Sequence, residues 1–126
     1  MEQYIFVNLS NHPSQKWDTD QREAAQKYGD IVDLPFPVVP PDHDENDISK
    51  LAEECISRIM SLEGNIVCAM VQGEFTLTFA IVKRLIQQGI EVVSACSERN
   101  TIERTDENGE IIRETRFKFV RFRRYE

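Results

Sequence analysis

Two almost entirely apolar runs, each preceded by a segment of helical period, constrain the fold of this chain more than any other feature. They are NIVCAMVQ (65–72) and IEVVSAC (90–96). A strand of this composition is buried on both faces, as in a parallel sheet that helices cover on either side. Parallel neighbours also need a crossover long enough to hold a helix. The two runs therefore predict an α/β fold with a mainly parallel sheet.

The N-terminal half supplies two further strands with a helix between them. YIFVNL (4–9) and DIVDLP (30–35) have strand composition, and Pro35 stops the second run. Asp18 or Thr19 is suited to cap the intervening helix, which Gly29 ends. The sequence Asp18-Thr-Asp20 is then a helix start and not a metal-binding motif.

Two longer helices complete the pattern. Asp44 or Asp47 opens one that ends at Gly64, and its apolar side chains fall on one helical face. These side chains are Ile48, Leu51, Ala52, Cys55, Ile56 and Ile59. The other helix ends at Gly89 and is predicted to bury Phe75, Phe79, Val82, Leu85 and Ile86. The order βαβαβαβ predicts a Rossmann-like three-layer sandwich.

The C-terminal segment changes character. Asn108-Gly109 lies between two β-rich runs and predicts an antiparallel hairpin with a two-residue type I′ turn. At 126 residues, the chain is expected to form one domain (1–126), with 99–126 as a hairpin extension.

Charge is unevenly spread along the chain. The formal net charge is −7, which disfavours broad binding of duplex DNA. Residues 1–98 carry seven basic and sixteen acidic side chains, whereas residues 99–126 carry eight basic and six acidic ones. The basic segment is either a solvated hairpin that protects its own edge or a holder for a small anionic ligand.

Several classes of protein are disfavoured. No apolar run approaches the roughly 18 residues of a membrane span, and the N-terminus lacks the basic region of a secretory signal. Three cysteines, Cys55, Cys68 and Cys96, lie in apolar patterns, which predicts buried thiols in a reducing cytoplasm. With two histidines and no CxxC, we expect no metal site and no cofactor. The chain also lacks the GxGxxG, P-loop, HExxH and GxSxG motifs.

Ligands of open parallel α/β sheets bind at the carboxyl ends of the strands. Polar clusters follow three of the four predicted strands there. The candidate residues are Asn8, Ser10, Asn11 and His12, then Gln72, Gly73, Glu74 and Thr76, then Ser97, Glu98 and Arg99.

Each cluster also has a purely structural interpretation. Side chains from Asn8 to His12 could serve turn chemistry, and Gly73 could simply allow close packing. Glu74 and Thr76 could only cap a helix, and Arg99 could be a solvated rim residue. In the functional alternative, Gly73 leaves room for a phosphate beside free backbone N–H groups.

The motifs NLSNHPSQKW and QGEFTLTFAIVKRLIQQGIEVVSACSER resemble small stand-alone proteins of type III CRISPR systems. Those proteins are similar to the CARF (CRISPR-associated Rossmann fold) superfamily. The resemblance implies a homodimer that binds a cyclic oligoadenylate and, in ring nucleases, opens it without metal through its ribose 2′-OH. It implies catalytic roles for Glu74 and His12, with the other candidates holding the ligand. Because the predicted domain uses all 126 residues, we expect no effector domain and a degrading or buffering role.

Two further interpretations stay open at this level. A module of the same fold could bind or sequester the nucleotide without cleaving it. The chain could instead be a protein-interaction domain whose basic hairpin meets an acidic partner.

Overall fold

A five-stranded sheet in the order β2-β1-β3-β4-β5 forms the centre of the computed structural model, which describes residues 2–126. The strands are β1 (Tyr4–Ser10), β2 (Asp30–Pro35), β3 (Asn65–Gln72), β4 (Glu91–Thr105) and β5 (Ile111–Arg124). Strands β1 to β4 pair in parallel, and β4 and β5 pair antiparallel. The predicted mixed α/β fold with its C-terminal hairpin is confirmed.

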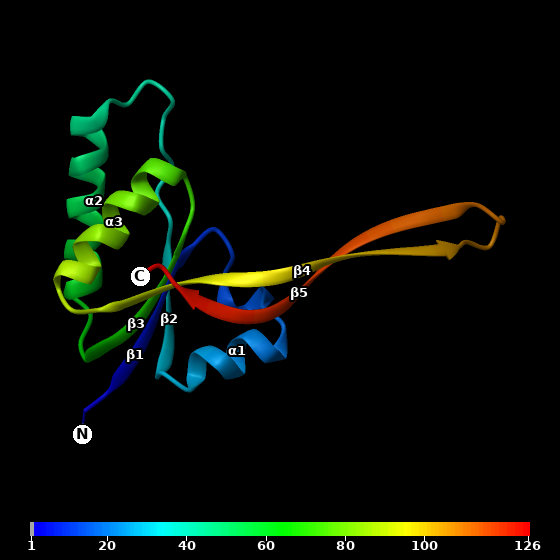
Figure 1. Cartoon of the computed structure of the whole chain (residues 1–126), viewed down its shortest axis with the longest axis horizontal. Helices are drawn as coiled ribbons and strands as arrows, with labels where there is room; N and C mark the ends of the chain where they lie inside the picture. The colour runs from blue at the N-terminus through cyan, green and yellow to red at the C-terminus, as the bar shows by residue number, and fades with distance from the viewer. Residues whose placement is uncertain (1) are drawn as a thin grey trace.

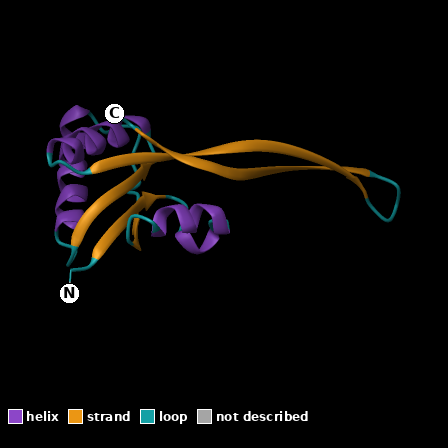
Figure 2. Cartoon of the chain, turned by 60° about the horizontal axis from the view of Figure 1, so that its bottom comes forward, coloured by secondary structure: helices purple, strands orange, loops and turns teal. Residues whose placement is uncertain are grey.

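Helices cover both faces of the parallel part of the sheet. One face carries α1 (Thr19–Gln26), and the other carries α2 (Glu45–Met60) and α3 (Phe75–Gln87) (Figures 1 and 2). A single 3₁₀ turn, η1 (Ser14–Lys16), precedes α1. No helix within residues 2–126 is long and apolar enough to cross a membrane.

The pleat of β1 divides the core into two clusters. Ile5, Val7 and Leu9 pack with α2 and α3, whereas Phe6 packs on the α1 side against Trp17. Alternate residues of a strand point to opposite faces, so one apolar strand supplies both clusters. The expected burial of β3 on both faces is likewise confirmed.

The predicted inner face of α3 is partly wrong. Phe75 and Phe79 are 89% and 70% exposed, and Ile86 is 40% exposed. Val82 and Leu85 are buried as expected, together with Leu77, Thr78 and Ile81. The sequence of this helix is apolar around most of its circumference, so its periodicity allows more than one inner face, and packing against the sheet and α2 selects one.

The hairpin is longer than expected, and its turn is of another type. β4 continues through position 96 to Thr105, so that one strand belongs both to the body and to an arm that projects from it (Figure 1). Asn108 does not adopt the positive φ that a type I′ turn requires, while Gly109 has φ +80°. The N–H of Gly109 donates to Asp106, and the carboxylate of Asp106 accepts from the backbone N–H groups of Asn108 and Glu110. A turn with a left-handed glycine after it replaces the two-residue loop.

Candidate functional site at the carboxyl edge of the sheet

Strand order places a crevice between β1 and β3. From β1 the chain moves outward to β2, then crosses back over β1 to β3 and continues to β4. The direction of progression therefore reverses between β1 and β3, and open α/β sheets bind ligands outside the carboxyl ends of the strands at such a point. The predicted clusters after β1 and β3 both lie at this edge.

The edge is widened because β3 and β4 pair only briefly. Their register runs from Cys68 opposite Glu91 to Met70 opposite Val93. Beyond it, the side-chain oxygen of Gln72 accepts a hydrogen bond from the backbone N–H of Ala95. A side chain thus replaces the backbone ladder where the two strands diverge.

Two cavities flank this position and share His12 and Gln72. The switch-point cavity has a volume of about 310 Å³ and is lined by Asn11, His12, Gln72, Gly73, Phe75, Thr78, Ser94 and Tyr125. The α1-side cavity, of about 680 Å³, is lined by His12, Lys16, Trp17, Asp18, Gln21, Met70, Gln72, Ala95, Ser97, Phe117 and Phe119. Four predicted residues, Asn11, His12, Gln72 and Gly73, therefore meet in one place.

The backbone of His12 is held by three side chains. Its carbonyl oxygen accepts from Asn8 Nδ2 at 2.9 Å and Trp17 Nε1 at 3.1 Å, and its backbone N–H donates to Ser10 Oγ at 3.2 Å. Asn8 is held in turn by Asp33, whose Oδ1 accepts from Nδ2 at 2.9 Å. The imidazole is exposed and makes no hydrogen bond within residues 2–126. The loop is fixed while the ring stays available.

The buried polar side chains of this loop have a structural role. Asn8 is 1% exposed and Ser10 is 6% exposed, and Ser10 donates to Asn8 Oδ1 at 2.7 Å. The turn-chemistry interpretation is therefore confirmed for both residues. Direct ligand contact by either one stays a prediction.

Gly73 satisfies a packing requirement inside the protein. A Cβ added there would lie 2.5 Å from three atoms of the Phe36 ring. Such a contact is too close for a real side chain, and Phe36 is itself only 6% exposed. The glycine therefore lets the segment after β2 pack against the end of β3, and its φ is not positive.

Glu74 and Thr76 form the cap of α3. The carboxylate of Glu74 accepts from the backbone N–H groups of Thr76 at 2.9 Å and Leu77 at 2.8 Å, and from the Thr76 hydroxyl. Slight burial acts to raise the pKa of Glu74, but the hydrogen bonds from Leu77 and Thr76 outweigh it and hold the pKa below its ordinary value. Capping is confirmed, and neither residue lines either cavity.

Thr78 is a site residue that the sequence did not indicate. It is 8% exposed, lines the switch-point cavity, and its hydroxyl has no hydrogen-bond partner within residues 2–126. A buried hydroxyl without a partner is costly, so this position is suited to a hydrogen bond with a ligand atom or a water. Its place inside an apolar helix gave no sequence signal.

Tyr125 also closes this cavity, although it lies near the end of the chain. Its hydroxyl donates to the carbonyl of Val71 at 2.6 Å, and its backbone N–H donates to Val92. Lys16 adds a cation to the α1-side cavity, where Asp18 contributes the opposite charge. No local pattern predicts that residues so far apart in sequence meet at one edge.

The third predicted cluster is only partly at the site. Ser97 lines the α1-side cavity, whereas Glu98 and Arg99 lie on the exposed start of the arm and line neither cavity. Cys96 lies beside a register shift in β4 and is half-buried, whereas the sequence predicted a fully buried thiol. Burial raises the pKa of the Cys68 thiol to about 12, so this thiol stays protonated.

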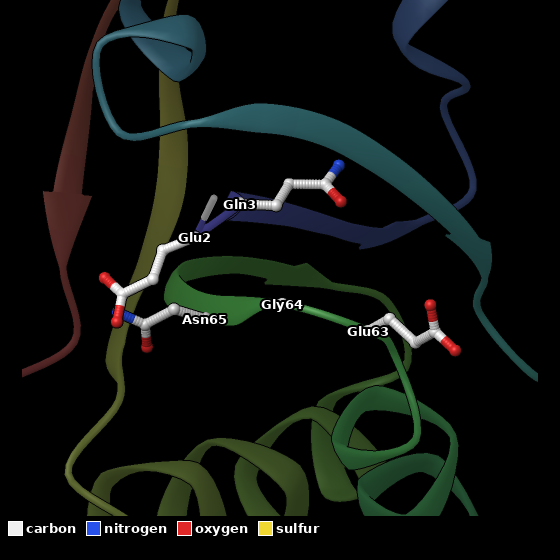
Figure 3. A pocket seen from close by; sticks show the side chains of 5 residues that line it. All are labelled: Glu2, Gln3, Glu63, Gly64 and Asn65. Atoms are coloured by element: carbon white, nitrogen blue, oxygen red, sulfur yellow. The ribbon is translucent and has the colours of Figure 1, made fainter.

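A further hollow, of about 500 Å³, lies at the opposite, amino edge of the sheet. It is lined by Glu2, Gln3, Glu63, Gly64 and Asn65 (Figure 3). Figure 3 shows the carboxylates of Glu2 and Glu63 pointing away from each other. The five lining residues include no serine, threonine, cysteine, lysine or histidine. The carboxyl edge is the better candidate.

Within residues 2–126, no group of three or more His, Cys, Asp or Glu side chains has the arrangement of a metal site.

A comparison with curated proteins gives no match. A family model, described as the uncharacterized protein MJ1673 family, matches residues 4–123. Because this match spans nearly the whole chain, the protein belongs to that family.

Proposed function

We propose that this protein binds a nucleotide ligand at the carboxyl edge of the sheet. The observation that carries the proposal is His12, whose backbone is fixed by three hydrogen bonds while its exposed ring borders both cavities. A fixed loop that leaves its imidazole free is suited to proton transfer or ligand binding.

The surroundings of His12 suit a nucleotide. The unpartnered hydroxyl of Thr78 and the side chain of Ser94 offer hydrogen bonds to ribose or base. Phe75 borders the same cavity with its ring 89% exposed, and exposed aromatic rings stack on bases. Lys16, at the α1-side cavity, supplies a charge for phosphate.

Within this class, we propose a cyclic oligoadenylate as the ligand, on the strength of the resemblance to stand-alone CARF proteins. Two cavities that meet at His12 and Gln72 offer room for more than one nucleotide unit. The ligand would be held by a homodimer, and the reaction would end type III CRISPR signalling.

The proposed reaction is an internal transesterification. A ribose 2′-oxygen attacks the adjacent phosphorus, the bond from phosphorus to the 5′-oxygen breaks, and a 2′,3′-cyclic phosphate and a 5′-hydroxyl result. His12 accepts the proton of the 2′-hydroxyl, and a proton must reach the departing 5′-oxygen. The protein mainly holds the three reacting atoms in line.

His12 has more support than Glu74 as the group that transfers the proton. The carboxylate of Glu74 already accepts hydrogen bonds from Thr76 and Leu77, and its pKa is lowered. A carboxylate with a lowered pKa is a weaker base. Its role in the proposal is to fix the start of α3 beside Phe75 and Thr78.

The same observation favours a second candidate function. With Glu74 committed to the cap, one imidazole is the main proton-transfer group of each chain. A protein of this design could bind or sequester cyclic oligoadenylate without opening it. Product analysis separates the two functions, because a binder retains the intact ring.

The decisive experiment is incubation with cyclic tri-, tetra- and hexa-adenylate in EDTA, followed by chromatography. We expect a linear product that ends in a 2′,3′-cyclic phosphate. His12→Ala should slow its formation roughly 100-fold or more, the usual contribution of general acid–base catalysis. His43→Ala is the matched control, since His43 lines neither cavity.

Other results would redirect or remove the proposal. An intact ring that co-elutes with the protein, and is lost with Phe75→Ala, would support the binding function. Neither cleavage nor binding of any of the three rings would overturn the nucleotide proposal.

A further inference from the structure

The outer edge of β5 is open along most of the arm. Only β4 pairs with this strand, and nothing within residues 2–126 bonds its other edge from Ile111 to Lys118. At Phe119 the edge is closed, because the backbone N–H of Phe119 donates to Asp18 Oδ2 at 3.1 Å. The open edge therefore has two defined limits, the turn and the start of α1.

The open edge also carries apolar side chains. Ile111 and Phe117 are each 69% exposed, and Ile102 on the neighbouring strand is 41% exposed. Figures 1 and 2 show the arm leaving the body with no other element beside it. Two-stranded ribbons are marginally stable alone, and long open edges with apolar side chains invite pairing.

The arm is divided into halves of opposite charge. The outer half, residues 103–114, holds five acidic and two basic side chains. The inner half, residues 98–102 and 115–124, holds one acidic and six basic side chains. Two arms that lie antiparallel would therefore bring the acidic half of each arm next to the basic half of the other.

Ion pairs inside the arm leave the charges at its two ends available. Arg104 pairs with Glu114 at 3.0 Å, and Arg113 pairs with Glu103 at 3.1 Å. Among residues 2–126, no cation lies within ion-pair distance of Glu110 near the turn, and no carboxylate lies that close to Lys118 at the base.

The geometry points to a second copy of this chain as the partner of the open edge. Two β5 strands would pair antiparallel about a two-fold axis and merge the two arms into one four-stranded sheet. This inference is independent of the proposed ligand.

The limits of the open edge, together with its side chains, fix the register of that pairing. In a two-fold antiparallel pair, opposed residues have a constant sum of sequence numbers, and both must point to the same face. Registers centred on Glu114 and on Thr115 overlap the open edge equally. The side chains favour Glu114, because the Thr115 register would place Ile112 opposite the partner's Lys118. In the Glu114 register, Ile111 lies opposite the partner's Phe117, and Glu110 lies opposite the partner's Lys118. Apolar side chains meet apolar ones, and acid meets base.

The centre of the interface contains the one unfavourable contact. Glu114 would face the partner's Glu114, and like charges opposite each other destabilise a sheet. Arg104 and Arg116 already pair with the two oxygens of this carboxylate, at 3.0 and 3.1 Å. Its charge is therefore offset within each arm before the two arms meet.

A charge exchange tests the inference on the full chain without nucleotide, by sedimentation equilibrium. Glu110→Lys alone and Lys118→Glu alone should each raise the dimer dissociation constant roughly tenfold or more, because the symmetry places each contact twice. The double variant Glu110→Lys/Lys118→Glu should restore it. Lys50→Glu, which reverses an exposed cation of α2 away from the open edge, is the control and should leave dimerisation unchanged.

Cysteine crosslinking tests the register itself. The double variant Ile111→Cys/Phe117→Cys should form a disulfide-linked dimer on oxidation. Either single variant should not, because each new thiol then faces an apolar side chain and lies several residues from its own copy. The three native cysteines are present throughout.

Two results would overturn the inference. One is a monomer at every protein concentration tested. The other is a dimer that neither charge reversal weakens and that the cysteine pair does not link, since such a dimer uses another surface. Neither result bears on nucleotide binding, which is measured separately on the native protein and on the Glu110 and Lys118 variants, because Phe117 lines the α1-side cavity.

Discussion

Three positions of the carboxyl edge that the sequence selects as site candidates serve different purposes in the structure. Asn8 holds the His12 loop, Gly73 makes room for Phe36, and Glu74 caps α3. Each purpose depends on what lies within hydrogen-bond or van der Waals distance. Of the two predicted catalytic residues, His12 and Glu74, only His12 keeps its side chain free for a ligand.

The cap at Glu74 predicts a pH dependence of stability. Its folded pKa is lowered, so its contribution is fully present above the unfolded pKa and is lost as pH falls through the folded pKa. At pH 7, Glu74→Gln should reduce the unfolding free energy by about 1 kcal/mol or less, as for other exposed caps. In acid, below the ordinary range of a glutamate, the two proteins should converge.

Denaturant unfolding from pH 7 to pH 3 checks this expectation. Glu63→Gln is the control, because Glu63 is exposed and makes no hydrogen bond or ion pair within residues 2–126. A difference between Glu74→Gln and the native protein that stayed constant across the pH range would contradict the cap as its source.

At the scale of elements, strong local signals predict where helices and strands begin better than which face they bury. Asp18 and Asp44 cap α1 and α2 as expected from their residue type. By contrast, α3 buries Leu77 and Ile81 and leaves Phe75 and Phe79 exposed. Capping is local chemistry, whereas the choice between apolar faces is made by the neighbours of the helix.

Asp18 joins two elements and should therefore matter more than an ordinary cap. One carboxylate oxygen caps α1 through the N–H of Gln21, and the other accepts from the N–H of Phe119 in β5. Asp18→Ala should lower the unfolding free energy by more than the roughly 1 kcal/mol of a cap alone. Asp44→Ala, which removes a cap without a contact to β5, is the matched control.

Hydrogen exchange separates the two contributions of Asp18. The amide of Phe119 should exchange faster in Asp18→Ala and at its native rate in Asp44→Ala. Equal exchange in both variants would show that the bond across to β5 contributes nothing measurable.

At the scale of the whole molecule, the arm is peripheral to the body. The two core clusters lie within the layered part, and β5 reaches them only through its last residues, such as Phe122. The arm beyond the pair Arg99–Phe117 is a two-stranded ribbon with exposed faces. The arm is therefore longer than the packing of the body requires.

Shortening the arm should therefore leave the body intact and remove the dimer. Replacing residues 100–116 with Asn-Gly joins two residues that already oppose each other, Arg99 and Phe117. We expect a monomer whose unfolding free energy lies within about 1 kcal/mol of that of a native monomer, by sedimentation and denaturant unfolding. Loss of folding would show that the arm is part of the core.

The sequence by itself determined the elements, their order and the class of the fold. Continuous apolar runs predicted buried parallel strands, and Asp18, Asp44 and Gly89 marked the ends of helices, because periodicity and capping are properties of neighbouring residues. The same runs, with the carboxyl-end rule, also selected His12 and Gln72.

Only the tertiary structure decided which candidates have free side chains and what else reaches the site. Thr78 and Tyr125 join the cavity from a helix and from the C-terminal end, and Phe36 accounts for Gly73. The open edge of β5 likewise follows from strand order. These are contacts between distant parts of the chain, so no local pattern encodes them, and the burial that sets their energy exists only once the chain is folded.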